Sequence, residues 1–265
     1  MTEISRTEPP MPDPSAIEPA LLKRVMLLLA IAQIPMLVLL GFLLIPGSPL
    51  PGHLVRNYIL AHPEILPEAI EKLRAGDVAK AEQAERDAQK ALPASLAAVR
   101  KPYASAHAGN PNGDVTVVAF MDYACGYCRA SLPGIEDLIA KDPNVRVVYR
   151  EYPVLGPESA MAARWALAAA EQGKYLAFHN ALYAEGSPSA ETIGAAAAKA
   201  GLDKAQAQKS VASQAVKDEI DSNHALGQKL AMSGTPSWVI GDQLVYGAKD
   251  YQGLAEAVAE ARKAK

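Results

Sequence analysis

The sequence predicts an α/β domain with a helical insertion, preceded by one transmembrane helix and a short helical region. Three observations lead to this prediction. An uncharged apolar run occupies residues 25–45, and β-branched runs at 115–121 and 145–152 are typical of buried strands. Alanine-rich helical sequence over about 158–231 then separates these strands from a strand pair at 237–246. Half of the residues are hydrophobic and the net charge is -3, which fits a globular protein and argues against a nucleic-acid-binding surface.

The apolar run VMLLLAIAQIPMLVLLGFLLI, residues 25–45, is long enough to span a bilayer. An uncleaved anchor is favoured over a cleavable signal peptide, because the run exceeds the usual apolar region of about 7 to 15 residues and a polar tail precedes it. Lys23 and Arg24 stand directly before the run, and the next cation is Arg56. The positive-inside rule therefore predicts a cytoplasmic amino terminus, with residues 1–24 as a disordered, proline-rich tail.

Residues 46–104 are predicted to be a helical spacer or an oligomerisation region. Apolar residues at helical spacing in 53–76 fit two short helices that are broken near Pro63. A further helix, rich in alanine and charged residues, is predicted over 77–92 with Asp77 as its N-cap. The apolar face of this helix is mostly alanine, so a solvated spacer is favoured over an oligomer stalk, and both stay open.

The α/β domain is predicted to occupy residues 105–265. Its first strand, VTVVAFM at 115–121, is an almost continuous apolar run, and a helix with a kink at Pro133 follows it. The second strand, VRVVYREY, covers 145–152. The chain therefore begins this domain in the order strand, helix, strand.

The second half of this domain is predicted to be a helical insertion, a hairpin and a last helix. The insertion covers about 158–231, with Ser189 and Asp203 placed to begin helices. SWVI and QLVY, within 237–246, form a hairpin around a Gly-Asp turn. Asp250 is expected to cap the final helix.

The only two cysteines, Cys125 and Cys128, stand in the motif CGYC directly after the first strand. Cys125 is thereby placed at a helix start, where the helix dipole and free N–H groups favour the thiolate and lower a cysteine pKa to roughly 3.5 to 7.5. Cys128 lies one turn later on the same face and can close a disulfide. We predict that Cys125 is the exposed nucleophile and Cys128 the resolving thiol, and that Gly126 and Tyr127 between them tune the redox balance.

Other uses of a C-x-x-C pair fit the sequence less well. Haem attachment requires a histidine after the second cysteine, where this chain has Arg129. A zinc site would need two more ligands, and the five histidines are scattered without paired spacing. An inert structural disulfide stays open, although so short a loop would add little stability. Trp165 and Trp238 are assigned to packing, and His179 to a structural or exposed position.

The strand followed by CGYC, the segment VVYREYPVLGPESAMAARWALAAAEQGKY and the segment SGTPSWVIG resemble the DsbA-like thiol–disulfide oxidoreductases of the bacterial periplasm, which have a thioredoxin fold. The resemblance covers about residues 105–265, and YILAHPEILPEAIEKL is similar to the amino-terminal helices of some ScsC-type members. It implies that Pro236 is a cis-proline beside the disulfide and that the backbone of Thr235 pairs with a substrate peptide. The combination of CGYC with Thr-Pro is similar to the isomerase DsbC.

The main departure from this pattern is the lack of an acidic residue before the cysteines. DsbA has an acidic residue six positions before its first cysteine, and this chain has Ala119 there, so no buried acid is carried over to that position. Asp122, three positions before Cys125, matches other members of the family. It is assigned a tuning role at the thiol, with a solvated or turn-capping aspartate as the alternative.

The sequence as a whole thus predicts a thiol–disulfide oxidoreductase anchored in the inner membrane by a single helix, with its catalytic domain in the periplasm. Cysteine-containing client proteins and a membrane redox partner of the DsbB or DsbD type are the implied partners, and a homo-oligomer is left open. No metal, nucleic acid or cofactor is expected beyond a redox-active disulfide between Cys125 and Cys128. The alternative is a membrane-tethered, non-catalytic thioredoxin-fold binding module. Whether the enzyme is an oxidase, isomerase or reductase depends on its redox poise and recycling partner.

Overall fold

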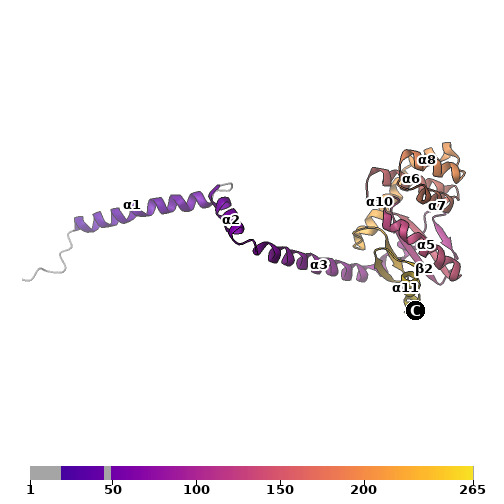
Figure 1. The fold of residues 1–265 in the computed structure, drawn as a ribbon, viewed down its shortest axis with the longest axis horizontal. Helices are drawn as coiled ribbons and strands as arrows, with labels where there is room; N and C mark the ends of the chain where they lie inside the picture. The colour runs from indigo at the N-terminus through magenta and orange to yellow at the C-terminus, as the bar shows by residue number, and fades with distance from the viewer. Residues whose placement is uncertain (1–18, 45–48, 265) are drawn as a thin grey trace, which may run out of the picture. The chain divides into compact units, whose positions relative to one another are not determined.

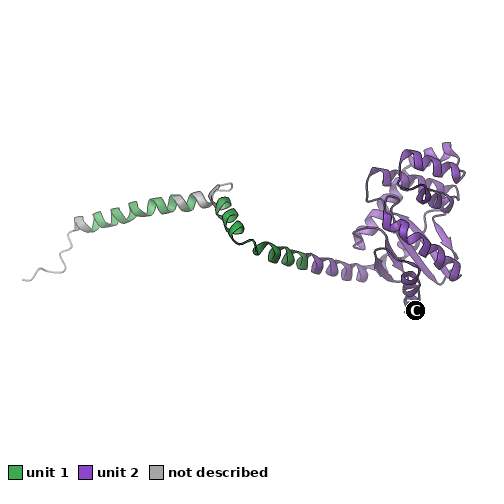
Figure 2. Ribbon diagram, viewed as in Figure 1, with its two compact units in different colours: residues 1–76 green, residues 77–265 purple. Residues whose placement is uncertain are grey.

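The computed structural model describes residues 19–44 and 49–264, and the chain falls into two compact units. The first unit is Met1–Gly76 and the second is Asp77–Lys265, coloured green and purple in Figure 2. All candidate site residues predicted from the sequence belong to the second unit.

The described part of the first unit is helical. Helix α1 covers Pro19–Leu44, α2 covers Pro49–Ala61, and α3 covers Ile65–Ala91 and so continues into the second unit (Figure 1). The helical chain is interrupted between α2 and α3, which confirms the break predicted near Pro63.

The predicted membrane span, residues 25–45, falls mostly on α1. In the part of the chain that the structure describes, no helix is both long enough and apolar enough to cross a membrane. The span stays a prediction. The disordered tail predicted for residues 1–24 falls mainly on residues 1–18, which lie outside the described part. For residues 19–24 the prediction is wrong, because they belong to α1.

The separate helix predicted to begin at Asp77 is wrong, because α3 runs without interruption through this position. Gly76 lies inside the helix, where glycine costs about 1 kcal/mol relative to alanine. Good helix formers on both sides outweigh this cost. Ion pairs between side chains four residues apart stabilise the helix further. One of these joins Lys72 to Glu68 at 2.7 Å.

The second unit is built on a five-stranded sheet with the strand order β1-β3-β2-β4-β5. Strands β2 and β3 are parallel to each other, and the remaining pairs are antiparallel. The strands are β1 His107–Gly109, β2 Val115–Met121, β3 Val145–Glu151, β4 Ser237–Ile240 and β5 Gln243–Tyr246. The two predicted strands and the predicted hairpin are confirmed. The sequence does not predict β1, because three residues are too few to show an alternating pattern.

Helices make up most of the rest of this unit. Their bounds are Leu92–Ser95 for the 3-10 helix η1, Leu96–Arg100 for α4, Gly126–Lys141 for α5, Pro157–Glu171 for α6, Tyr175–Glu185 for α7, Ala190–Lys199 for α8, Lys204–Val211 for α9, Gln214–Lys229 for α10 and Tyr251–Lys263 for α11. Helices α6 to α10 form the insertion between β3 and β4. The N-caps predicted at Ser189, Asp203 and Asp250 are confirmed, because each side chain accepts a hydrogen bond from a backbone N–H of its helix.

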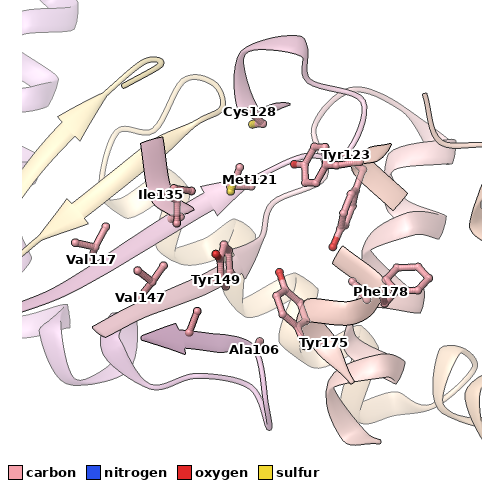
Figure 3. Packing of buried hydrophobic residues seen from close by; sticks show 14 of the residues in the cluster. Ala106, Val117, Met121, Tyr123, Cys128, Ile135, Val147, Tyr149, Tyr175 and Phe178 are labelled. Carbon is pink, nitrogen blue, oxygen red and sulfur yellow. The ribbon is translucent and has the colours of Figure 1, made fainter. Parts of the chain in front are cut away.

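The core lies on both faces of the sheet. Alternate residues of β2 face opposite ways: Met121 points into the larger cluster of buried side chains (Figure 3), whereas Val118 and Phe120 belong to the cluster on the other face. Since both faces of β2 are covered, its sequence is an almost continuous apolar run. Trp238 is fully buried in the larger cluster and Trp165 packs against it, as their assignment to packing predicts.

Candidate functional site

The two cysteines lie where β2 leads into α5. Cys125 is the N-cap of α5, and its Sγ accepts a hydrogen bond from the Cys128 backbone N–H at 3.4 Å. The predicted position at a helix start is therefore confirmed. The Cys125 thiol also donates to the carbonyl oxygen of Thr235 at 3.2 Å. Cys125 keeps 6% of its surface exposed, less than the prediction of an exposed nucleophile implies, because the loop that contains Thr235 lies against it.

The second sulfur is sealed from solvent. Cys128 has no exposed surface, and Figure 3 places it near Met121 and Tyr123. Burial raises the pKa of the Cys128 thiol far above its ordinary value, while the Asp122 backbone N–H and the Thr235 side chain act in the opposite direction. The Asp122 N–H donates to Cys128 Sγ at 3.5 Å. At neutral pH Cys128 is therefore a protonated thiol.

The loop before β4 completes the surroundings of the sulfurs. The peptide bond between Thr235 and Pro236 is cis, which confirms what the family resemblance implies. Thr235 contacts both cysteines, Cys125 through its carbonyl oxygen and Cys128 through its side chain. The structure thus brings Thr235 to the cysteine pair, although the two lie more than a hundred residues apart in the sequence. Pairing of the Thr235 backbone with a substrate peptide stays a prediction.

The carboxylate of Asp122 is buried and accepts four hydrogen bonds. Its Oδ1 accepts from the backbone N–H of Ala124 at 2.8 Å and from the hydroxyl of Ser159 at 2.6 Å. Its Oδ2 accepts from the backbone N–H groups of Val154 and Leu155, at 2.8 and 3.0 Å. The solvated alternative is wrong and the turn-capping one is confirmed. The backbone N–H of Asp122 donates a hydrogen bond to a cysteine sulfur, whereas the four hydrogen bonds of its carboxylate all come from other residues.

The two residues between the cysteines differ in their surroundings. Tyr127 is 71% exposed, so its side chain is available to a bound protein. A Cβ added to Gly126 would meet nothing within 4 Å, so sterics do not require glycine here. The next residue, Arg129, donates from its guanidinium to the carbonyl oxygen of Gly186 at 2.6 Å and so ties the start of α5 to the helical insertion.

A buried carboxyl group near the site was not predicted from the sequence. Glu151, the last residue of β3, accepts hydrogen bonds on Oε1 from Tyr175 at 2.6 Å and from Tyr123 at 3.2 Å. The hydroxyl of Tyr123 also lies 3.0 Å from Nδ1 of His179. The position that is acidic in DsbA holds Ala119 here, and the carboxyl group is buried on the neighbouring strand instead.

Burial sets the protonation of this cluster. It raises the pKa of Glu151 to about 8 and lowers the pKa of His179 to about 3, so both groups are uncharged at neutral pH. His179 is fully enclosed, with four tyrosine rings around its imidazole, which settles it as a structural residue. The burial of Glu151 could not be predicted from the sequence, since a charged residue at the end of a strand normally marks the exit of the chain into solvent.

Comparison with known proteins identifies this arrangement. Residues 116–259, more than half of the chain, match the DSBA-like thioredoxin domain family. The chain belongs to the DsbA-like family. Residues 52–80 also match the N-terminal domain of the copper resistance protein ScsC.

Solved structures of similar proteins support thiol–disulfide oxidoreductase activity for this DsbA-like chain. A thioredoxin-like oxidoreductase from Silicibacter pomeroyi is 48% identical with a TM-score of 0.58, covering 60% of this chain and 92% of that one. The catalytic domain of Proteus mirabilis ScsC is 28% identical with a TM-score of 0.59, and the match covers 65% of this chain and 97% of that domain. The thiol–disulfide exchange protein α-DsbA2 from Wolbachia pipientis is 30% identical with a TM-score of 0.59, and the match covers 69% of this chain and 97% of that protein. These similarities favour the enzyme over the non-catalytic binding module.

Two curated relatives have a different name. The chain is 28% identical over 156 residues to the Na(+)/H(+) antiporter NhaA 3 of Salinispora tropica and 27% identical over 156 residues to NhaA 1 of Salinispora arenicola. The match covers 58% of this chain and 24% of each relative. This DsbA-like chain thus spans about a quarter of the length of the curated relatives that it matches.

Replacing Glu151 with glutamine should change how stability depends on pH. An unfolded glutamate ionises near pH 4.5, whereas Glu151 in the fold keeps its proton to about pH 8, so the free energy of unfolding should fall as pH rises between these values. His179 has the opposite effect on the free energy of unfolding, because burial lowers its pKa from 6.5 to about 3, and this effect no longer changes with pH above about 6.5. Between pH 6.5 and 8 the wild-type chain should therefore lose about 2 kcal/mol that Glu151→Gln does not lose. Urea unfolding of both chains, followed by tryptophan fluorescence, measures this difference, and parallel pH profiles would show that Glu151 is ionised in the fold.

Replacing Thr235 with valine should lower the reduction potential of the cysteine pair. The Thr235 side chain forms a hydrogen bond with Cys128, and a thiol, which can donate as well as accept, forms stronger hydrogen bonds than a disulfide sulfur, so removal of this hydroxyl destabilises the reduced protein. A hydrogen bond of about 0.5 to 1 kcal/mol corresponds to a shift of roughly 10 to 20 mV to more negative values. Equilibration with glutathione and alkylation of free thiols measures the potential. The matched control is Thr116→Val, at the end of β2 that lies farther along the strand from the cysteines. Equal potentials in the wild-type chain and both variants would contradict the contact between Thr235 and Cys128.

Proposed function

We propose that the chain exchanges disulfides with cysteine-containing client proteins through Cys125 and Cys128. The observation that carries this proposal is the difference between the two sulfurs. Cys125 caps the helix and keeps some exposed surface, whereas Cys128 is fully enclosed and has a raised pKa. A client can therefore reach one sulfur, and the other is held one helical turn away to complete the exchange.

In the oxidising direction, a client thiolate attacks Sγ of Cys125 in the Cys125–Cys128 disulfide. A bond forms between the client sulfur and Cys125, the bond between the two cysteines breaks, and Cys128 leaves as a thiolate. Its raised pKa means that this thiolate takes up a proton. A second client thiolate then attacks the first client sulfur, which releases an oxidised client and the Cys125 thiolate.

The same steps in reverse reduce or rearrange a client disulfide. The direction is set by the redox partner that recharges the pair, and we propose a membrane protein of the DsbB or DsbD type for this role. A partner that accepts electrons keeps the pair oxidised for client oxidation. A partner that donates electrons keeps it reduced for isomerisation or reduction.

We propose that residues 25–45 anchor the protein in the inner membrane, with the amino terminus in the cytoplasm and the catalytic unit in the periplasm. The support is the uncharged apolar run itself and the cations Lys23 and Arg24 before it. A similar solved structure is a periplasmic thioredoxin-like protein from Salmonella enterica, 30% identical. Carbonate extraction of bacterial membranes tests the anchor, and recovery of the whole chain in the soluble fraction would refute it.

The predicted spacer or oligomerisation region, residues 46–104, is too long at its carboxyl end, because Leu92 and Val99 are fully buried in the core of the second unit. We propose that residues 46–91 act as a spacer, with a homo-oligomer as the alternative. The side chains of α3 are exposed along most of its length, and ion pairs on its surface such as Arg86 with Glu82 at 3.5 Å suit a solvated helix. Sedimentation of the detergent-solubilised chain distinguishes a monomer from an oligomer.

Replacing Cys128 with alanine should trap clients on the enzyme. Cys125 can still attack a client disulfide, but no second thiol can release the mixed disulfide that forms. Non-reducing gels of bacteria that produce Cys128→Ala should show a ladder of adducts that disappears with reductant. Cys125→Ala is the control, and it should give none. Equal ladders from both variants, or none from either with the fold intact, would argue against the assigned roles.

A further inference from the structure

The backbone carbonyl of Thr235 contacts the reachable sulfur. The Cys125 thiol donates its hydrogen to this oxygen at 3.2 Å. A disulfide sulfur has no hydrogen to donate, so this contact exists only while Cys125 is a thiol. The contact therefore stabilises the reduced chain relative to the oxidised chain, and it does so only as long as the loop holds the Thr235 carbonyl in place.

The hydroxyl of Ser237 holds the middle of this loop, residues 231–236 between α10 and β4. It donates to the carbonyl oxygen of Gly234 at 2.7 Å, and the hydrogen bond encloses Thr235. Ser237 is the first residue of β4 and pairs with Phe120 of β2, the strand that leads into the cysteine motif. Its surface is 2% exposed, so little water can compete for the hydrogen bond. The loop is thereby fixed relative to the strand that leads to the cysteines.

The hydroxyl of Tyr152 holds the start of the same loop. It donates to the carbonyl oxygen of Met232 at 3.2 Å. The backbone N–H of Tyr152 donates to the carbonyl oxygen of Met121 at 2.8 Å, so this tyrosine is also fixed to the end of β2. Its ring lies directly against the backbone of α10, where a Cβ added to Gly227 would come within 2.6 Å of the ring. Tyr152 thus connects the end of β2 with the helix and the loop that precede β4.

We propose that Ser237 and Tyr152 are positioning residues that hold the Thr235 carbonyl against the Cys125 thiol and so set the balance between the reduced and the oxidised cysteine pair. The inference rests on the proposed function, since it concerns the same pair. Removal of either hydroxyl lets the loop move, which weakens a contact that only the reduced chain has. Ser237 has the larger effect, because its acceptor belongs to the residue directly before Thr235.

The test compares the wild-type full-length chain with Ser237→Ala and Tyr152→Phe, each of which loses one hydroxyl group. The chains are equilibrated with glutathione buffers of varied ratio, the free thiols are alkylated, and the reduced and oxidised fractions are measured by mass spectrometry. In Ser237→Ala the equilibrium constant should move about twofold to fivefold toward the oxidised chain, the size expected for one hydrogen bond. In Tyr152→Phe it should move in the same direction by a smaller factor.

Ser105→Ala is the matched control, because the hydroxyl of Ser105 also donates to a backbone carbonyl, that of Ala170 at 2.9 Å. Its equilibrium constant should equal that of the wild-type chain. A purely structural hydrogen bond stabilises the reduced and the oxidised chain equally, so its loss lowers the free energy of unfolding of both and leaves their ratio unchanged.

The positioning role would be overturned by wild-type equilibrium constants in Ser237→Ala and Tyr152→Phe, by a shift toward the reduced chain, or by an equal shift in Ser105→Ala. If Ser237→Ala does not fold, the equilibrium constant of Tyr152→Phe decides between these outcomes. Failure of the wild-type chain to form an internal disulfide in any of the buffers would instead overturn the proposed function.

Discussion

The buried carboxylate of Asp122 is the interaction on which the site depends. Four hydrogen bonds converge on it, from the turn before Cys125, from the loop after β3 and from the first turn of α6. A buried carboxylate is costly unless it is well satisfied, so these segments are held together strongly. The carboxylate thereby fixes the beginning of α5 relative to the helical insertion, and the backbone N–H of the same residue contacts the sulfur of Cys128.

This fixed geometry makes the two cysteines chemically different. Cys125 caps α5 and keeps a small exposed surface, whereas Cys128 is fully enclosed in the core. Burial penalises the Cys128 thiolate, so this sulfur is at its most stable as a thiol or within a disulfide.

Local signals in the sequence predicted much of this architecture. The strand before the cysteines, the helix caps at Ser189 and Asp250 and the hairpin depend on neighbouring residues, and the structure has all of them. Apart from Ala124, the partners of the Asp122 carboxylate lie 32 to 37 residues away, and Glu151 is bound by tyrosines 24 and 28 residues away, which no local pattern reveals. The same limit explains Asp77, whose capping propensity was overridden by the helix formers before and after it.

The central claim is that Cys125 and Cys128 act as one redox pair. Its most direct test is to equilibrate the full-length chain with glutathione buffers of varied ratio, alkylate the free thiols and weigh the products by mass spectrometry. The account predicts a single two-electron transition in which both thiols disappear together into an internal disulfide. Accumulation of Cys125 as a stable glutathione adduct, with Cys128 still a free thiol, would contradict it.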